Sequence, residues 1–231
     1  MGYIMIKIAI DGPSGSGKST LAKALSKKLG FVYVDTGALY RTIGLYVTEK
    51  GISYNDKDGV IASLPEINVD LTYDESGAQH VLLNGNDVGD RIRTSEIAAA
   101  ASAVSAIPEV RAFLLDTQRN MALTHNVIMD GRDIGTVIFP DAQVKIYLVA
   151  SNVARAERRC EELRAKGENK TVEEVLNDMS ARDKNDSTRK TAPAVPAVDA
   201  VFLDTSAYQP EETLEAALKI INAKVPGLSI K

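Results

Sequence analysis

The feature that most limits what this chain can fold into is a glycine-rich stretch near its start. Residues 12–19 read Gly-Pro-Ser-Gly-Ser-Gly-Lys-Ser, which satisfies the GxxxxGK[ST] pattern at every position. The apolar run Ile4–Ile10 precedes it, and a helical pattern with Leu21, Leu25 and Leu29 on one face follows it. A strand, a tight glycine loop and a helix in this order predict a phosphate-binding loop that opens an α/β fold.

Each residue type in this loop suits a polyphosphate. The glycines let the backbone come close to phosphate oxygens, so that its N–H groups form an anion cradle. Lys18 would neutralise β- and γ-phosphate charge, and the Ser19 hydroxyl would ligate Mg²⁺. The residues expected to bind the triphosphate are Gly12, Pro13, Ser14, Gly15, Ser16, Gly17, Lys18, Ser19 and Thr20.

Short apolar runs alternate with helical patterns along the chain. The runs expected to be strands are Ile4–Ile10, Phe31–Val34, Val127–Asp130, Val144–Val149 and Asp199–Asp204. The main helices are expected from Ser19 to Gly30, after Thr36, over Thr94–Ser105, from Pro108, and over Asn152–Lys166, Thr171–Asp183 and Pro210–Ala223. The Thr36 hydroxyl can cap the second of these helices, and Thr171 with Glu174 forms a capping box at the start of the sixth. Five buried strands separated by helices predict an open five-stranded parallel sheet with helices on both faces.

Residues 65–90 have a different pattern. Ile67–Tyr73 and Gln79–Asn84 alternate like hairpin strands, and Asp74, Ser76 and Gly77 supply a turn. We therefore expect a small antiparallel insertion in the α/β scaffold. Residues 37–105 are assigned to this insertion, and residues 1–36 and 106–231 to the core, with a helical lid within residues 155–190.

Composition limits the kind of partner. The 231 residues carry a formal net charge of -4, so a nucleic-acid polymer is not expected as a ligand. A single cysteine, Cys160, excludes an intrachain disulfide and agrees with a reducing cytoplasm. No stretch reads as a membrane span. We expect a cytoplasmic monomer that binds small molecules.

Three charged clusters extend the candidate site. Arg41 follows the second expected strand, where open α/β sheets bind ligands, although a surface Arg on an amphipathic helix is the alternative. Asp130, Arg132 and Asp133 follow an apolar strand. A carboxylate there is typical of a metal-binding acid, and an arginine fork matches phosphate; a capping Asp with a structural ion pair is the other interpretation.

The third cluster is helical. Arg155, Arg158 and Arg159 are spaced i, i+3, i+4, and Arg182, Asp186 and Arg189 are spaced i, i+4, i+7. The second set shares a face only if its helix continues past Asp183. Such a hairpin of helices suits a cationic lid over the site, with Arg155 and Arg158 near the triphosphate. A solvated, charge-laced helix pair remains the alternative.

Taken together, these motifs resemble bacterial-type cytidylate kinases. The resemblance covers residues 8–204, and its most specific part is the segment 130–140, Asp-Gly-Arg-Asp-Ile-Gly-Thr-Val-Ile-Phe-Pro. The motifs that carry it are the phosphate loop, residues 35–41, 92–94, 130–140 and 182–189. The resemblance implies a P-loop nucleoside monophosphate kinase that moves the γ-phosphoryl group of ATP onto CMP or dCMP, with Mg²⁺.

The resemblance also implies residue roles. Arg41, Arg132 and Arg189 would bind the acceptor phosphate, and Ser102, Arg111 and Asp133 would recognise cytosine. Arg182 and Asp186 would act near the sugar and the transferring group. Thr36 is expected to bind the substrate; it stands where a serine is expected and keeps the hydroxyl. The residues expected to act in catalysis are Lys18, Arg132, Arg182 and Arg189, and those expected to hold the metal are Ser19 and Asp130.

Other functions remain open from the sequence. One is a kinase for another small acceptor, such as AMP, UMP or shikimate. Another is a P-loop switch that signals through a partner, and a third is an inactive nucleotide-binding scaffold. The arginine-rich lid favours a kinase over a switch, because a switch commonly receives its arginine from a partner. Intact Lys18 and Ser19 argue against the scaffold.

Overall fold

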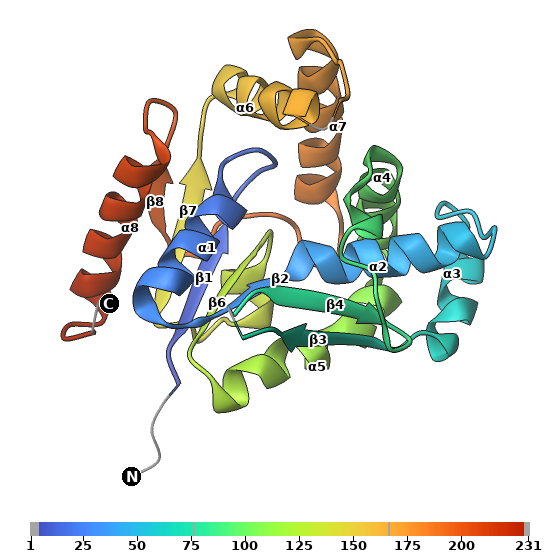
Figure 1. The fold of residues 1–231 in the computed structure, drawn as a ribbon, viewed down its shortest axis with the longest axis horizontal. Helices are drawn as coiled ribbons and strands as arrows, with labels where there is room; N and C mark the ends of the chain where they lie inside the picture. The colour runs from blue at the N-terminus through green and yellow to red at the C-terminus, as the bar shows by residue number, and fades with distance from the viewer. Residues whose placement is uncertain (1–4, 76, 166, 229–231) are drawn as a thin grey trace.

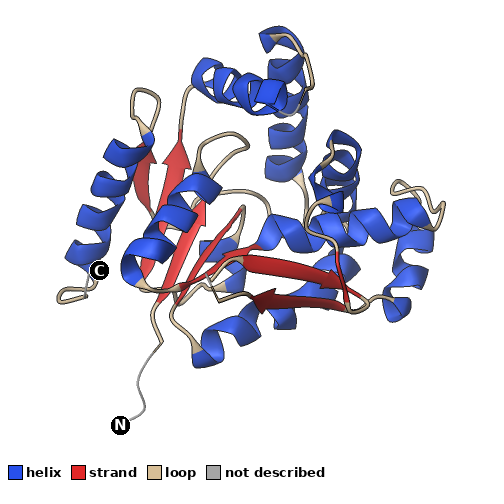
Figure 2. Ribbon diagram, viewed as in Figure 1, coloured by secondary structure: helices blue, strands red, loops and turns tan. Residues whose placement is uncertain are grey.

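The computed structural model describes residues 5–75, 77–165 and 167–228, and within these residues the chain forms two sheets. The larger is a five-stranded parallel sheet, as predicted (Figures 1 and 2). In spatial order its strands are β2 (Val32–Asp35), β6 (Val127–Gly131), β1 (Lys7–Asp11), β7 (Val144–Val149) and β8 (Val201–Asp204). The first strand begins later than predicted, and Ile4 lies outside the described residues.

Helices cover both faces of this sheet because its strands are apolar on both sides. In β1, Ile8 and Ile10 pack with helices α1 and α8, whereas Ala9 packs on the opposite face, next to α5. The helices of the core are α1 (Lys18–Leu29), α5 (Pro108–Thr124) and α8 (Pro210–Lys224). Taken one at a time, no helix in the described part of the chain is long and apolar enough to cross a bilayer; α4 (Ser95–Val104) and α5 meet that test only as a pair, which is bent by 101°.

The predicted insertion is a separate layer beside the core, drawn on the right in Figure 1. The hairpin strands β3 and β4 pair antiparallel, and a short third strand, β5, which was not predicted, joins them. Ser76, which was expected in the turn, lies outside the described residues. The elements of this layer are α2 (Thr36–Glu49), α3 (Lys57–Ser63), η1 (Leu64–Glu66), β3 (Val69–Tyr73), β4 (Gln79–Leu83), β5 (Asn86–Asp87), η2 (Arg91–Arg93) and α4 (Ser95–Val104).

Two helices, α6 (Asn152–Ala165) and α7 (Val172–Thr188), form a hairpin above the carboxyl ends of the strands (Figure 1). Lys166, where the first of them was expected to end, lies outside the described residues. The Thr171–Glu174 capping box opens α7 as predicted. The helix continues five residues past Asp183, so that Asp186 lies inside it and Arg189 caps it.

The start of α2 corrects one expectation. The Thr36 hydroxyl was expected to cap this helix, but it donates instead to the Asp130 backbone oxygen at 2.8 Å. Asp35 is the N-cap, and its carboxylate accepts the Ala38 N–H at 3.0 Å. Either residue type caps a helix well. Here the neighbouring strand β6 offers Thr36 a carbonyl, and this leaves the cap to Asp35.

Candidate active site

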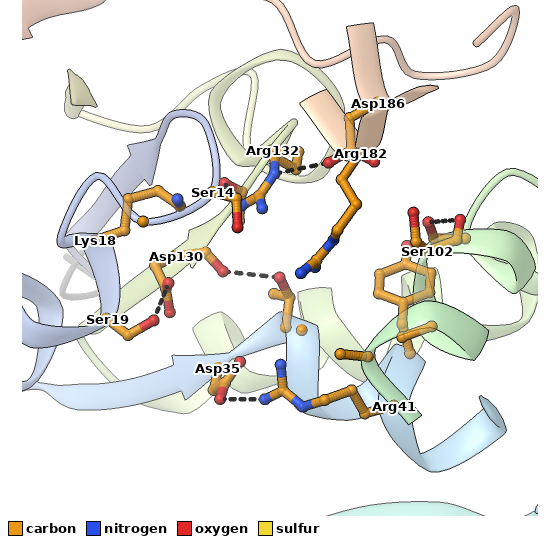
Figure 3. Close-up of a pocket in the computed structure, with 18 of the residues that line it drawn as sticks. Ser14, Lys18, Ser19, Asp35, Arg41, Ser102, Asp130, Arg132, Arg182 and Asp186 are labelled. Atoms are coloured by element: carbon orange, nitrogen blue, oxygen red, sulfur yellow. Dashed lines mark hydrogen bonds and ion pairs between the residues drawn. The ribbon is translucent and has the colours of Figure 1, made fainter. Parts of the chain in front are cut away.

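A cavity of about 630 Å³ lies at the carboxyl ends of the parallel strands, where the phosphate loop, the insertion and the lid meet (Figure 3). Among its described lining residues, nine are Lys or Arg and five are Asp or Glu. The chain as a whole is acidic, so this local excess of cations marks a site for a small anion. The predicted site residues that line the cavity are Ser14, Gly15, Gly17, Lys18, Ser19, Thr20, Thr36, Arg41, Ser102, Arg111, Asp130, Arg132, Asp133, Arg182, Asp186 and Arg189.

The phosphate loop joins β1 to α1 and depends on its glycines. Gly12 has φ +150, and a Cβ there would stand 2.2 Å from the Leu148 carbonyl oxygen. Gly17 is the left-handed N-cap of α1, with φ 89. Only glycine adopts such a close approach and such a dihedral without strain. The first N–H groups of α1 are therefore free to face an anion.

Lys18 is buried beneath this loop. Its Nζ donates to the Pro13 carbonyl at 2.6 Å and to Ser16 Oγ at 3.4 Å. Burial, together with the nearby charge of Arg132, lowers the pKa of Lys18 to about 7. An anion bound in the cavity would favour the charged ammonium and so raise the pKa of Lys18.

The lid already contacts the loop. The Ser14 N–H donates to Asp183 Oδ1 at 3.0 Å, and Arg155 Nη1 donates both to the Ser14 carbonyl at 2.8 Å and to the Asp183 carboxylate. A lid carboxylate thus occupies one N–H of the anion cradle.

Asp130 joins the loop to the opposite wall of the cavity. Its carboxylate accepts from Ser19 Oγ and from the Tyr33 hydroxyl, each at 2.8 Å. Burial raises the pKa of Asp130, and the nearby Asp35 charge adds to that effect. Burial makes a charged carboxylate costly unless a cation lies beside it, so Asp130 is a candidate partner for a cation.

Guanidinium groups from three parts of the chain converge on the other end of the cavity. Arg41 on α2 pairs with Asp35 at 2.8 Å, and Arg132, after β6, donates from Nε to Asp186 at 2.9 Å. Arg182 reaches from α7 into the space between them (Figure 3). Burial lowers the pKa of Arg182, and the neighbouring Arg132 lowers it further.

These arginines keep unused hydrogen-bond donors. Among the described residues, the buried Nε atoms of Arg41 and Arg182 find no hydrogen-bond partner, and neither does Nη2 of Arg189. Buried donors are seldom left unpaired, because each costs about 1–3 kcal/mol. These donors are therefore available to an anionic ligand.

A buried ion pair closes this end. Arg111 on α5 donates to Asp133, and Arg189 Nη2 lies 3.6 Å from the same carboxylate. Arg111 also stands over the Tyr40 ring, 5.4 Å from its centroid. Ser102 on α4 lines the same end. A carboxylate and a guanidinium held side by side present one acceptor and several donors to a planar polar ligand.

The segment that carries Arg132 and Asp133 is fixed by a residue that the sequence did not reveal as part of the site. The N–H groups of Ile134 and Gly135, which begin the π-helical segment η3 (Ile134–Ile138), both donate to the Asp11 carboxylate at 2.8 Å. Burial raises the pKa of Asp11 to about 6. The only signal was a carboxylate at the end of a buried strand, directly before Gly12.

Some predicted residues lie elsewhere. Of the described residues, Gly12, Pro13, Ser16, Arg155 and Arg158 do not line the cavity. The Arg158 guanidinium bonds the loop after β8, through Thr205 Oγ1 at 3.2 Å and the Thr205 carbonyl. Conversely, Tyr40 and Arg93 line the cavity without an individual role having been predicted for them, and Arg159, which was predicted only as part of the cationic lid, lines it as well.

A phosphate loop that faces a guanidinium-lined pocket under a two-helix lid defines a P-loop kinase of a small anionic acceptor. The family model of cytidylate kinase matches residues 8–223. The chain belongs to the cytidylate kinase family, which confirms the resemblance carried by the motifs.

Relatives named cytidylate kinase match along nearly their whole length. That of Carboxydothermus hydrogenoformans is 44% identical over 95% of this chain and 98% of its own. That of Fervidobacterium nodosum is 46% identical over 94% of this chain and 97% of its own. A crystal structure from Thermus thermophilus is similar in fold, with a TM-score of 0.50 at 22% identity over 97% of this chain and 100% of its own.

Proposed function

We propose that this protein transfers the γ-phosphoryl group of ATP to CMP and dCMP, forming CDP and dCDP. The observation that carries the proposal is the buried Arg111–Asp133 pair beside the unpaired arginine donors. The arginines suit the acceptor phosphate, and the pair suits a base that presents an amine donor beside acceptor atoms. Family membership supports the same substrates.

On the donor side, the N–H groups of the loop and Lys18 would bind the ATP phosphates, in the roles predicted for residues 12–20. Arg155 and Arg158 were predicted to bind the donor directly. Their contacts with Ser14, Asp183 and Thr205 instead support a role in holding the lid against the loop.

Magnesium suits the donor set at Ser19 and Asp130. The two side-chain oxygens are 2.8 Å apart, and among the described residues no group of three or more His, Cys, Asp or Glu side chains could hold a metal. Mg²⁺ is commonly held by one or two protein oxygens, with substrate phosphates and water completing its shell. When bound, it would neutralise phosphate charge; Ser19 and Asp130 would orient it.

On the acceptor side, we assign the CMP phosphate to Arg41, Arg132 and Arg189, with Thr36 beside them. Asp133 would accept from the cytosine amine, Arg111 would donate to the ring acceptors, and Ser102 would contact the same edge. Arg182 and Asp186 would bind near the sugar and the transferring group. A site that relies on such hydrogen bonds rejects the wrong base, because its own buried groups would go unpaired.

The chemistry needs alignment more than proton transfer. An oxygen of the CMP phosphate attacks the γ-phosphorus, and the bond from that phosphorus to the β–γ bridging oxygen breaks, leaving ADP. The attacking oxygen is already anionic, so no strong general base is required. Lys18, Arg132, Arg182 and Arg189 would stabilise the charge on the transferring group. Closure of the lid would exclude water, which would otherwise accept it.

The parts of the chain divide the work in the same way. Residues 37–105 would be the acceptor-binding insertion, residues 155–190 would contain the lid, and residues 1–36 and 106–231 would form the core. We propose a monomer that acts on small molecules in the cytoplasm, without a nucleic-acid polymer as partner. The single cysteine agrees with a reducing compartment.

The test is an ADP-release assay with ATP, Mg²⁺ and each common nucleoside monophosphate in turn. CMP and dCMP should accelerate ADP release strongly, and UMP and AMP much less. If ADP release is no faster with CMP or dCMP than without any added monophosphate, the proposal fails. If AMP or UMP is the best acceptor, the kinase class stands and the assignment of the base does not.

A further inference from the structure

Strand β2 lies at the edge of the parallel sheet, and among the described residues no strand pairs with its outer side. The Val32 N–H points toward β6, where it donates to the Asn126 carbonyl at 2.9 Å. Because backbone groups alternate in direction along a strand, those of Tyr33 and Asp35 point the other way, to the open edge. An unpaired strand edge needs a cover.

Two side chains of the insertion provide that cover. The Tyr73 hydroxyl donates to the Tyr33 carbonyl at 3.0 Å, and the Asp35 N–H donates to Gln79 Oε1 at 2.9 Å. Tyr73 and Gln79 are directly opposite each other in the β3–β4 register, so they project from one face of the hairpin. A matched cross-strand pair thus takes the place that a sixth strand would hold.

The bond from Gln79 falls on the residue that organises the acceptor end. Asp35 caps α2 through the Ala38 N–H and holds Arg41 Nη2 at 2.8 Å. Asp35 and Arg41 both line the cavity, whereas Gln79 and Tyr73 are not among its described lining residues. The bond from Gln79 therefore reaches the acceptor end through Asp35.

We propose that Gln79 and Tyr73 are positioning residues for the acceptor phosphate, acting through Asp35 on Arg41. The inference rests on the proposed function and goes beyond it, since it assigns the antiparallel hairpin a part in acceptor binding. A shift of the Asp35 backbone would move both oxygens of its carboxylate, and the Arg41 fork with them. The donor site, built on the β1–α1 loop, would stay in place.

The test is Gln79→Met, which keeps the length of the side chain and removes the acceptor. KM for CMP should rise about fivefold, from the loss of one hydrogen bond. KM for ATP should stay within about twofold. The matched control is Gln143→Met, because Gln143 Oε1 accepts the Lys7 N–H at 2.8 Å, a bond of the same kind at the opposite end of the sheet. This control should leave both KM values unchanged.

Two further variants keep the test decisive. Tyr73→Phe retains the ring and loses the hydroxyl, and it should raise KM for CMP about threefold, even if Gln79→Met fails to fold. In an Arg41→Lys background, Gln79→Met should have no further effect on KM for CMP, because the group it positions has been replaced. Equal effects of Gln79→Met and Gln143→Met, or equal changes in both KM values, would overturn the inference. Wild-type protein without CMP-dependent turnover would overturn the proposed function instead.

Discussion

In the proposed function, the two ends of the cavity would bind phosphate by different means. The donor end uses backbone N–H groups of one continuous loop with a single buried lysine beneath it. The acceptor end uses guanidinium groups from separate segments, each paired with a carboxylate: those of Arg41, Arg111, Arg132 and Arg189. Backbone donors need no side-chain order, whereas every guanidinium must be positioned by a partner.

This difference determines how each end responds to substitution. At the donor end, one side chain carries most of the charge, and the rest of the cradle survives its loss. At the acceptor end, the arginines and the carboxylates Asp35, Asp133 and Asp186 form a network, so that removal of one member leaves another buried and unpaired. Replacement of Lys18 should therefore lower the rate, and replacement of a carboxylate at the acceptor end should lower affinity and selectivity.

The largest effect is expected at Lys18. Lys18→Met should lower kcat by about 10³-fold, because a buried cation aimed at the transferring charge is lost. The loop conformation should persist, since Gly12 and Gly17 set it. Lys27→Met, an exposed lysine on the same helix, is the control. Steady-state kinetics in which Lys18→Met changed KM for CMP and left kcat intact would contradict the division between the two ends.

The next effect concerns selectivity at the acceptor end. Asp133→Asn removes the charge that pairs with Arg111 and replaces one acceptor oxygen with a donor. The ratio of kcat/KM for CMP to that for UMP should fall roughly 10- to 100-fold, the cost of a mispaired buried group. KM for ATP should change little.

The matched control for this prediction is Asp141→Asn, which breaks the exposed ion pair with Lys7 far from the cavity. It should leave the CMP to UMP ratio unchanged. A ratio that also survives Asp133→Asn would remove this carboxylate from base recognition and leave Arg111 as the reader of the base.

The same contrast explains what the sequence could predict. The donor loop is local, with the strand, the glycines and the helix all within residues 7–29, so the sequence pattern was sufficient to predict it. The parallel sheet and the α6–α7 hairpin were also predictable, from apolar runs and from the Thr171 capping box. The prediction that Ser102 and Arg111 lie at the acceptor end came from the family resemblance and not from residue spacing.

Other contacts depend on residues far apart in the chain. The π-helical segment η3 is fixed by Asp11, which is more than 120 positions away, and no local pattern signals that bond. Arg158 shares a helix face with Arg155, yet it ends on Thr205 because the loop after β8 offers carbonyls there. An arginine spacing shows which side chains share a face and cannot show which partner each will meet.

Asp11 connects the two ends of the cavity. It belongs to the strand of the donor loop and holds the segment of Arg132 and Asp133. Its pKa is raised from 3.8 to about 6 in the folded protein, so between these values the folded state binds more protons than the unfolded state. Its contribution to stability therefore falls as pH rises through this window.

The measurement for Asp11 is urea unfolding of wild type and Asp11→Asn at pH 5 and pH 7. The stability difference between wild type and variant should favour wild type more at pH 5, by about 1 kcal/mol. Subtracting the unfolding free energy of the variant from that of wild type cancels the contributions of the titrating groups that both proteins share. A stability difference that did not change with pH would show that folding does not raise the pKa of Asp11.

The smallest effect concerns a lid carboxylate that contacts the donor end. The Asp183 carboxylate accepts the Ser14 N–H, so it competes with an incoming phosphate oxygen for a donor of the cradle. An amide is a weaker acceptor than a carboxylate, because it lacks the charge. Asp183→Asn should therefore lower KM for ATP about threefold and leave KM for CMP unchanged.

Asp178→Asn is the control for Asp183, since it removes an exposed carboxylate from the same helix, where Asp178 pairs with Lys170 at 2.8 Å. It should leave KM for ATP unchanged, which separates local competition from a change in net charge. If Asp183→Asn raises KM for ATP instead, the carboxylate assists donor binding by holding Arg155 and the lid in place. The donor end would then depend on a positioned guanidinium as the acceptor end does, and the contrast between the two ends would hold only for the loop itself.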